Sequence, residues 1–166
     1  MKLLSSSVVA LLTAIAVISP LSAADKKVKL SEWKFGKVAF GEKITNKLTK
    51  DKVVVVEFWG VNCPPCIASL PHLAEMAKEK HDQGLVVIGA ESQMSTPAQM
   101  KPLLDTAKVQ YTITQGAEGP IQVSQLPRVF VFGKDGLLAF DGSPLSEEFP
   151  KAVDEALGTK AVADKH

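Results

Sequence analysis

The stretch EFWGVNCPPCIA, residues 57–68, contains both cysteines of the chain, Cys63 and Cys66, with two prolines between them. A pair at this spacing is compatible with a structural disulfide, half of a metal site, a haem attachment point or a redox couple. Each alternative requires different neighbours, because a metal needs further ligands and a redox couple needs surroundings that activate one sulfur. The rest of the chain therefore decides among them.

A buried strand precedes the pair and a helix follows it. Residues 53–59, VVVVEFW, form a continuous β-branched and aromatic run, which is typical of a strand covered on both faces. Apolar residues with helical spacing come next, to about Asp82: Ile67, Leu70, Ala74 and Ala77. Gly84 ends the helix, and residues 85–90 form a second apolar run of strand length. Strand, helix and strand in this order predict a parallel βαβ unit with a right-handed crossover.

The rest of the domain alternates helices and strands. The sequence STPAQ begins a helix at Thr96 with a capping box, and a short strand is expected around residues 111–114. RVFVF and LLAF, separated by residues 133–136, form a hairpin. Ser146 begins a last helix that ends before Gly158. The order of elements indicates the α/β class.

The N-terminus has the character of a secretory signal. Residues 1–24 combine Lys2, an apolar run over residues 8–18 and small residues before Ala24. An uncleaved membrane anchor is the alternative, but the apolar run is shorter than the roughly 20 residues that span a bilayer. We therefore expect cleavage after Ala24, export to the periplasm or an equivalent compartment, and no stable membrane insertion of the mature chain.

Three segments follow the signal. Residues 25–48 are expected to form an N-terminal extension with a short hairpin, because residues 28–40 mix aromatic, apolar and lysine residues around Gly36 and Gly41. Residues 49–158 are expected to form the main domain. Residues 159–166 are expected to form a flexible tail.

The mature chain carries almost no net charge. Removing the signal takes away Lys2, one of 19 basic residues, and leaves the 18 acidic residues unchanged. No basic stripe is left to bind phosphates, so nucleic acid is not expected as a partner. Export also sets the redox environment, because disulfides persist outside the cytosol.

The neighbours of the cysteines argue for a redox couple. Haem attachment requires histidine directly after the second cysteine, and position 67 is isoleucine. Zinc requires two further ligands, but one of the three histidines lies in the tail and one on the expected helix. A structural disulfide is the remaining alternative, yet closing so short a loop removes little entropy from the unfolded chain. No metal and no other cofactor is expected.

The position of Cys63 indicates how such a couple reacts. Cys63 lies where the strand gives way to the helix, as the N-cap, so the positive end of the helix favours its thiolate, which is the nucleophile. Cys66 can offer its backbone N–H to Cys63 and then attack the mixed disulfide. Pro64 and Pro65 stiffen the link and remove two N–H groups.

Residues 53–157 resemble the thioredoxin superfamily, and within it the exported branch of TlpA-, ResA- and CcmG-type thiol-disulfide oxidoreductases. The resemblance rests on EFWGVNCPPC after a buried strand, on Pro71 in the following helix and on QLPRVFVFGKDG, residues 125–136. It implies a thioredoxin-like fold with a central mixed β-sheet flanked by helices, to which this chain adds a short N-terminal β extension. It also implies that the Cys63–Cys66 couple is the catalytic dithiol.

The resemblance assigns two more residues to the site. Glu57 matches the family's buried carboxylate, six residues before the first cysteine, and is expected to relay a proton to Cys66. The alternative is a strand-end glutamate in solvent, since a charged side chain is rarely buried without a partner. Pro127 is expected to follow a cis peptide bond and to pack against the disulfide.

Substrate contacts are expected around the sulfurs. Trp59 is expected to border the exposed sulfur, and Leu126, Pro127 and Arg128 are expected to contact the partner protein. The chain departs from the family at two positions, because Asn62 replaces the tryptophan common before the first cysteine and Arg128 replaces the threonine common after the proline. Both departures can change partner choice, and a merely solvated side chain is the alternative for Arg128.

The resemblance favours a reductase that passes electrons to protein disulfides. It implies a membrane or soluble thiol electron donor of the DsbD or CcdA type, and a role in cytochrome c maturation or envelope redox homeostasis. A disulfide oxidase or isomerase uses the same residues and is an alternative. A second alternative is a Cu(I) metallochaperone of the Sco type, but that type spaces its cysteines by three residues and adds a later histidine, which this chain lacks between His81 and the tail.

Overall fold

The computed structural model describes residues 27–158. The predicted signal over residues 1–24 and the predicted tail over residues 159–166 lie outside the described residues. Within residues 27–158, no helix has both the length and the apolar character needed to cross a membrane.

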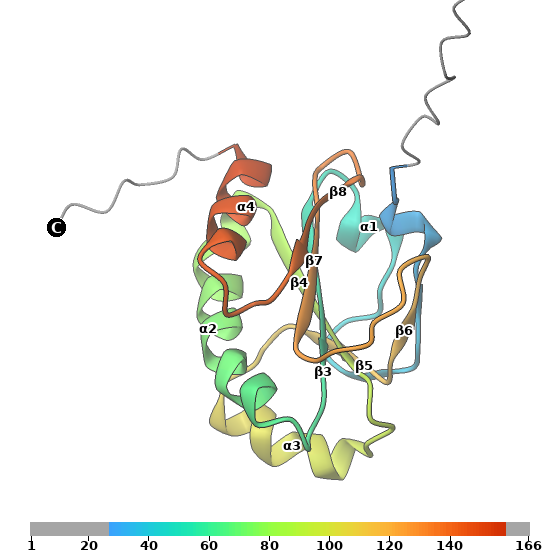
Figure 1. Ribbon diagram of the computed structural model, residues 1–166, viewed down its shortest axis with the longest axis vertical. Coiled ribbons are helices and arrows are strands. Elements are labelled where there is room, and N and C mark those ends of the chain that lie inside the picture. Colours follow the sequence, from blue (N-terminus) through green and yellow to red (C-terminus); the bar gives the residue numbers. More distant parts are fainter. Residues whose placement is uncertain (1–26, 159–166) are drawn as a thin grey trace, which may run out of the picture.

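A six-stranded mixed β-sheet forms the centre of the molecule, in the order β2-β5-β4-β3-β7-β8 (Figure 1). Its three central strands are β4 (Leu85–Glu91), β3 (Val53–Trp59) and β7 (Arg128–Phe132). The outer strands are β2 (Val38–Phe40), β5 (Thr112–Thr114) and β8 (Leu138–Gly142). Strands β3, β4 and β5 run parallel, whereas β7, β8 and β2 pair antiparallel with their neighbours. The predicted βαβ unit and the predicted hairpin are confirmed, because β3 pairs with β4 and β7 pairs with β8.

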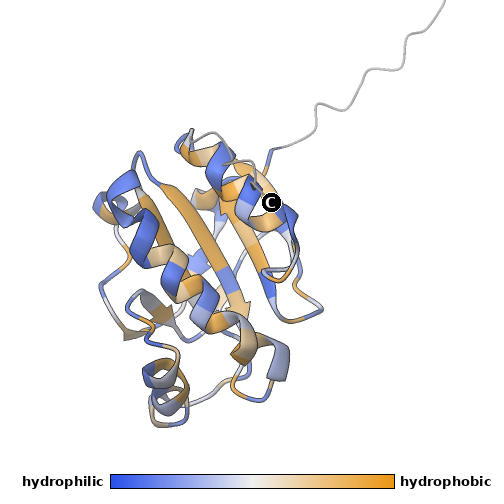
Figure 2. Cartoon of the chain, turned by 90° about the vertical axis from the view of Figure 1, so that its left-hand side faces the viewer, coloured by the Kyte–Doolittle hydropathy of each residue, from blue (hydrophilic) through white to orange (hydrophobic). Residues whose placement is uncertain are grey.

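Helices cover one face of this sheet. Helices α2 (Pro64–Lys80) and α4 (Glu148–Leu157) pack their apolar residues against it and turn their hydrophilic sides outward, as the colours in Figure 2 show. Helix α3 (Pro97–Thr106) packs beside the start of α2 through Met100 and Leu104. The capping box predicted at Thr96 is confirmed, whereas the N-cap of α4 is Glu147, one residue after the predicted Ser146. The predicted α/β class and mixed sheet are therefore confirmed.

Strand β3 is buried along its whole length, because both of its faces are covered. Side chains alternate along a strand, so Val53, Val55 and Trp59 lie on the side of α2 together with Glu57. The intervening residues, Val54, Val56 and Phe58, lie in the cluster on the opposite side. The C-terminal end of β3 leads directly into the turn before α2, which places the cysteines at the edge of the sheet.

The N-terminal extension covers the opposite face, beside β6 on the right of Figure 1. It contains a 3-10 turn (Leu30–Glu32), β1 (Lys34–Phe35), β2 and the short helix α1 (Asn46–Thr49). The hairpin predicted within residues 25–48 is wrong: β1 pairs with β6 (Ala117–Glu118), and β2 pairs with β5. The two strands therefore attach the extension to distant segments instead of to each other.

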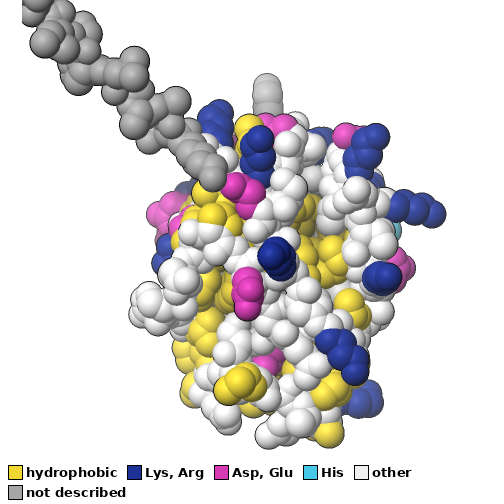
Figure 3. All heavy atoms as spheres, turned by 90° about the vertical axis from the view of Figure 1, so that its right-hand side faces the viewer, with side chains coloured by type: hydrophobic (Ala, Val, Ile, Leu, Met, Phe, Trp, Pro, Cys, Tyr) yellow, Lys and Arg dark blue, Asp and Glu magenta, His cyan; other side chains and the backbone are white. Residues whose placement is uncertain are grey.

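Burial of Trp33 accounts for this pairing. Its ring lies 4.8 Å from the Phe130 ring and 5.5 Å from the Phe58 ring, and its side chain is almost fully buried. Gly119, just after β6, has no side chain where a Cβ would come within 2.3 Å of the indole. The extension thus covers the apolar sheet face with Trp33, and Figure 3, which looks onto this side, shows hydrophobic side chains still visible between polar ones.

We predict that Trp33→Ala lowers the free energy of unfolding by about 3–5 kcal/mol, the usual cost of removing a large buried aromatic side chain. Trp33→Phe should cost much less, because the indole Nε1 makes no hydrogen bond within the described residues and a ring still fills most of the space. Urea unfolding of the oxidised protein measures both values. A loss below about 1 kcal/mol for Trp33→Ala would contradict the assigned packing.

Candidate active site

Cys63 and Cys66 form a disulfide at the N-terminus of α2. Cys63 is the N-cap, as predicted, and its Sγ accepts a hydrogen bond of 3.3 Å from the backbone N–H of Cys66. Pro64 and Pro65 occupy the first helical positions, where a missing N–H costs no helical hydrogen bond. Cys63 keeps 8% of its surface exposed, whereas Cys66 is completely buried. Of the two cysteines, only Cys63 therefore keeps any surface for an incoming partner to reach.

Glu57 lies on β3 beneath this turn and has no exposed surface. Its Oε1 accepts a hydrogen bond of 3.2 Å from the Ser69 hydroxyl, and its Oε2 accepts one of 3.1 Å from the Tyr111 hydroxyl. Burial raises the pKa of Glu57 from 4.5 to about 7, although the two hydrogen bonds oppose the rise. The alternative of a solvent-exposed glutamate is wrong, and the carboxyl group can hold or release a proton near neutral pH.

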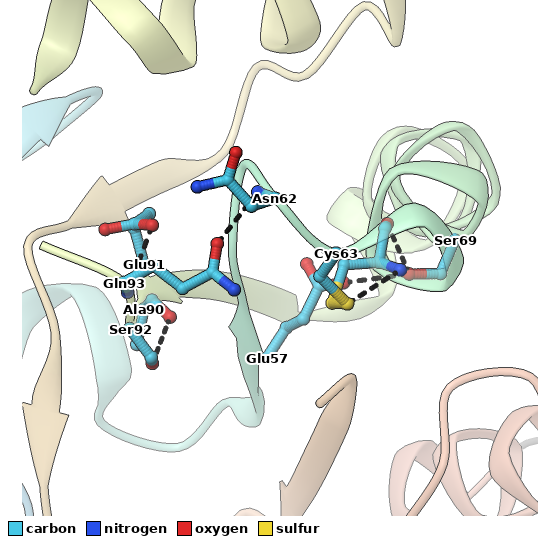
Figure 4. Close-up of a disulfide and its surroundings, with 9 residues drawn as sticks. Glu57, Asn62, Cys63, Ser69, Ala90, Glu91, Ser92 and Gln93 are labelled. Carbon is cyan, nitrogen blue, oxygen red and sulfur yellow. Dashed lines mark hydrogen bonds between the residues drawn. A yellow bond between two sulfur atoms is a disulfide. The ribbon is translucent and has the colours of Figure 1, made fainter. Parts of the chain in front are cut away.

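Ser69 joins the carboxylate to the active-site helix. Its hydroxyl lies 2.8 Å from the carbonyl oxygen of Cys66 and 3.2 Å from Glu57 Oε1, so it can donate to either acceptor. In Figure 4, the Glu57 side chain extends from β3 toward the start of α2, where Cys63 and Ser69 lie. The carboxyl group and the disulfide therefore belong to one buried site.

A loop at the end of β4 supports the turn that precedes Cys63. The Gln93 side chain accepts a hydrogen bond of 2.8 Å from the backbone N–H of Asn62, as Figure 4 shows. Gly60 makes room for it, because a Cβ there would lie 2.3 Å from the Gln93 side chain. Buried Glu91 holds the loop in place by accepting hydrogen bonds from the backbone N–H groups of Gln93 and Ser95. These hydrogen bonds thus fix the position of the loop relative to the turn that precedes Cys63.

The predicted substrate-contact residues have different environments. Trp59 has no exposed surface and packs in the same cluster as the cysteines, so the expectation that it contacts a partner is wrong. Leu126 is half-buried against that cluster, and the Leu126–Pro127 peptide bond is cis, as predicted. Arg128 is partly exposed and pairs through Nε with Asp141 Oδ1 at 2.5 Å, so it is not simply a solvated side chain.

Metal ligands are scarce around the sulfurs. Among residues 27–158, no group of three or more histidine, cysteine, aspartate and glutamate side chains is arranged to hold a metal ion. A copper ion at this site would therefore have the two sulfurs without a third such ligand from the described part of the chain.

Three residues of the site were not identified from the sequence: Ser69, Tyr111 and Gln93. Ser69 carried the clearest signal, because it is a polar residue one helical turn after Cys66 on a side of the helix that is otherwise apolar. Tyr111 is the only tyrosine of the chain, but its distance from Glu57 along the sequence hides their contact. Gln93 lies in a polar loop in which nothing distinguishes it from its neighbours.

We predict that Glu57→Gln stabilises the oxidised protein above neutral pH. The pKa of Glu57 is raised in the fold, so below the unfolded value both states are protonated and the group has no effect on stability. Between pH 4.5 and about 7 the unfolded chain releases the proton while the folded one keeps it, and wild-type stability falls. Above that range the cost is constant, at about 3 kcal/mol, and the variant lacks it.

Urea unfolding at several pH values between 4 and 9 measures this difference. Glu75→Gln is the matched control, because Glu75 is an exposed glutamate on α2. If wild type and Glu57→Gln lose stability in parallel over this range, Glu57 does not carry a raised pKa.

The comparisons with known proteins agree with this geometry. A family model described as the AhpC/TSA family matches residues 22–140. The thiol-disulfide oxidoreductase ResA of Bacillus thuringiensis (strain Al Hakam) is 28% identical over 100 residues, which are 58% of this chain and 57% of ResA. The chain thus matches somewhat more than half the length of this relative.

Solved structures show the same fold. A thiol:disulfide interchange protein of the thioredoxin family from Chlorobium tepidum TLS superposes with a TM-score of 0.67 at 21% identity, covering 81% of this chain and all of that one. A thiol-disulfide isomerase from Corynebacterium glutamicum has a TM-score of 0.66 at 19% identity, covering 84% and 99% of the two chains. The chain therefore belongs to the AhpC/TSA family and has a thioredoxin-like fold.

Proposed function

We propose that this protein is a thiol-disulfide oxidoreductase whose reactive group is the Cys63–Cys66 couple. The observation that carries the proposal is the arrangement of the two sulfurs: one is accessible at a helix N-terminus and one is buried beside a carboxyl group with a pKa near neutrality. A structural disulfide needs neither this asymmetry nor a buried acid. The similarity to ResA supports the same activity.

The first chemical step uses Cys63. In the reduced protein, its thiolate is stabilised by the N-terminus of α2 and by the backbone N–H of Cys66. The thiolate attacks one sulfur of a partner disulfide, and the other partner sulfur leaves with the bonding electron pair. A mixed disulfide between Cys63 and the partner results.

The second step uses Cys66 and Glu57. Ionised Glu57 accepts the proton of the Cys66 thiol, directly or through one water, and the resulting thiolate attacks the Cys63 sulfur. The Cys63–Cys66 bond forms, the mixed disulfide breaks, and the second partner sulfur leaves as a thiolate. Two electrons have then passed from the protein to its partner. A pKa of about 7 suits Glu57 for this exchange near neutral pH.

We further propose that the protein is exported and acts as a reductase. The signal-like character of residues 1–24 supports export. The proposed partners are protein disulfides on one side and a membrane or soluble thiol donor on the other, in cytochrome c maturation or envelope redox homeostasis. The reduction potential tests the direction: a value near the roughly −270 mV of thioredoxin supports a reductase, and one near the −120 mV of DsbA supports an oxidase.

A groove next to the site is the proposed contact for the partner chain. Ser92 and Gln122 add polar groups to its walls. The apolar side chains that line it are those of Phe58, Ile121, Val123 and Leu126. Leu126 also packs against the cluster that contains both cysteines, so it joins the groove to the active site. Leu126 and its neighbours Pro127 and Arg128 are the proposed recognition segment.

We predict that Cys63→Ser abolishes the reduction of insulin by dithiothreitol above the uncatalysed rate. Cys66→Ser should instead accumulate a mixed disulfide with insulin, because the buried sulfur that releases the partner is missing. Turbidity follows the first reaction, and non-reducing electrophoresis with mass spectrometry follows the second. Full turnover by Cys63→Ser would refute the assignment of the nucleophile. Stoichiometric copper in the reduced wild-type protein would favour the metallochaperone alternative.

We predict that Leu126→Ala raises KM for insulin several-fold and leaves the rate of reduction of the Cys63–Cys66 disulfide by dithiothreitol unchanged, because the small reductant does not need the groove. Leu145→Ala is the matched control, since Leu145 is an exposed leucine between β8 and α4. Equal KM values for Leu126→Ala and wild type would remove Leu126 from the recognition segment.

A further inference from the structure

The two oxygens of the Glu57 carboxylate face different parts of the molecule. Oε1 contacts Ser69, which is completely buried and leads only to the backbone of Cys66. Oε2 contacts the hydroxyl of Tyr111, a half-buried side chain just before β5. One oxygen is therefore directed to the active-site helix, and the other is directed away from it.

Tyr111 lies between Glu57 and a hollow on the molecular surface. The hollow has a volume of about 470 Å³ and is lined by Tyr111, by Ala74 and Ala77 of α2 and by Leu85 and Val87 of β4. Its residues from α2 belong to the C-terminal half of that helix, so the hollow opens well away from the cysteines. Ala74 is the lining residue of α2 nearest to the cysteines, and it lies eight residues beyond Cys66, about 12 Å along the helix axis.

A docked partner makes this second direction important. Cys66 and Glu57 have no exposed surface, and access to the sulfurs is through Cys63. A protein bound to Cys63 covers that access, so the proton that Glu57 takes from Cys66 cannot pass directly to solvent on the disulfide side. While the partner stays bound, a protonated Glu57 can therefore lose its proton to solvent only if another path leads to water.

We propose that Tyr111 is that path: its hydroxyl connects Glu57 to the hollow between α2 and β5, so that the buried acid exchanges protons with solvent on the side away from the disulfide. This inference rests on the oxidoreductase function proposed above. In the transfer, the protonated carboxyl group gives its proton to the phenol oxygen while the phenol O–H proton passes to a water in the hollow. The phenol remains neutral, and one proton has moved from Glu57 to solvent.

The chemistry of the phenol fits this role. Burial and the neighbouring Glu57 carboxylate raise the pKa of Tyr111 well above its usual value, so the hydroxyl keeps a proton to donate at physiological pH. The titratable groups that line the same hollow are Glu42, Lys78, His81 and Asp82, and His81 pairs with Asp82 at 3.1 Å. On the sheet, Glu57 has the apolar neighbours Gly89 and Val129 in register.

Tyr111→Phe tests the proposal, since it removes the hydroxyl and keeps the ring. The rate of disulfide formation in the reduced protein is followed with excess insulin by stopped flow, using tryptophan fluorescence, to which Trp59 in the cysteine cluster contributes. We expect the rate to fall several-fold at pH 6, where most Glu57 is protonated and must lose its proton before it can accept the one from Cys66. The midpoint of its pH profile should also move upward, since the lost hydrogen bond lowers the pKa of Glu57 in wild type.

Ala77→Met distinguishes a proton path through Tyr111 from a simple effect of the Tyr111 hydroxyl on the pKa of Glu57. It fills the hollow beside Tyr111 but leaves the Glu57 hydrogen bonds in place, so we expect a slower rate with an unchanged midpoint. Ala74→Met serves the same purpose if Ala77→Met does not fold, and thermal unfolding checks each variant. Gln110→Ala, an exposed position lining the hollow, is the control and should match wild type.

The outcomes are distinct. An unchanged rate in Tyr111→Phe, or a shifted midpoint in Tyr111→Phe with wild-type behaviour in the filled-hollow variant, overturns the path through Tyr111. If wild type itself does not exchange disulfides with insulin, the proposed oxidoreductase function fails instead.

Discussion

The burial of β3 on both faces is the constraint on which the structure depends. A strand covered on both sides has no solvent-facing positions, so every side chain from Val53 to Trp59 must fit a packed interior. Valine and aromatic residues meet this condition, and they hold β4 and β7 in register on either side. The same strand ends just before α2, so the packing of β3 fixes the position of the turn that carries Cys63.

Glu57 is the one charged residue within β3, and it is completely buried. A carboxyl group among valines lowers the stability of the fold once it ionises, by about 3 kcal/mol. The surrounding structure accommodates it with two hydroxyl donors, Ser69 and Tyr111, which reduce the penalty without removing it. The result is an acid that changes its protonation state near neutral pH, linked through Ser69 to the helix turn that carries Cys66.

The opposite face of the sheet must also be covered, and it is covered by a different part of the chain. Here the N-terminal extension supplies the cover, with Trp33 packed on Phe58 and Phe130. Phe58 is adjacent in the chain to Glu57 but points the other way, so the extension packs on the strand that carries the active-site acid. The extension and the cysteine cluster therefore both pack against β3, although they lie on different sides of the sheet.

Much of the fold could be predicted from the sequence, because the strongest signals are local. The apolar run of β3, the helical spacing of α2 and the turn residues between β7 and β8 each act over a few residues, and the structure confirms all three. The place of Cys63 at the helix N-terminus followed from the same local order. The pairing of the N-terminal strands did not, since β1 and β2 find partners some 70 or more residues away.

The candidate site shows the same difference between local signals and contacts that join distant segments. The sequence by itself determined that two cysteines and a glutamate six residues earlier lie at a strand-to-helix junction, because residues this close are placed by local geometry. Only the tertiary structure decided that Trp59 is buried, that Gln93 supports the turn before Cys63, and that Tyr111 contacts Glu57. These contacts join segments up to 54 residues apart, and they depend on strand order and helix packing, which no single stretch of sequence encodes.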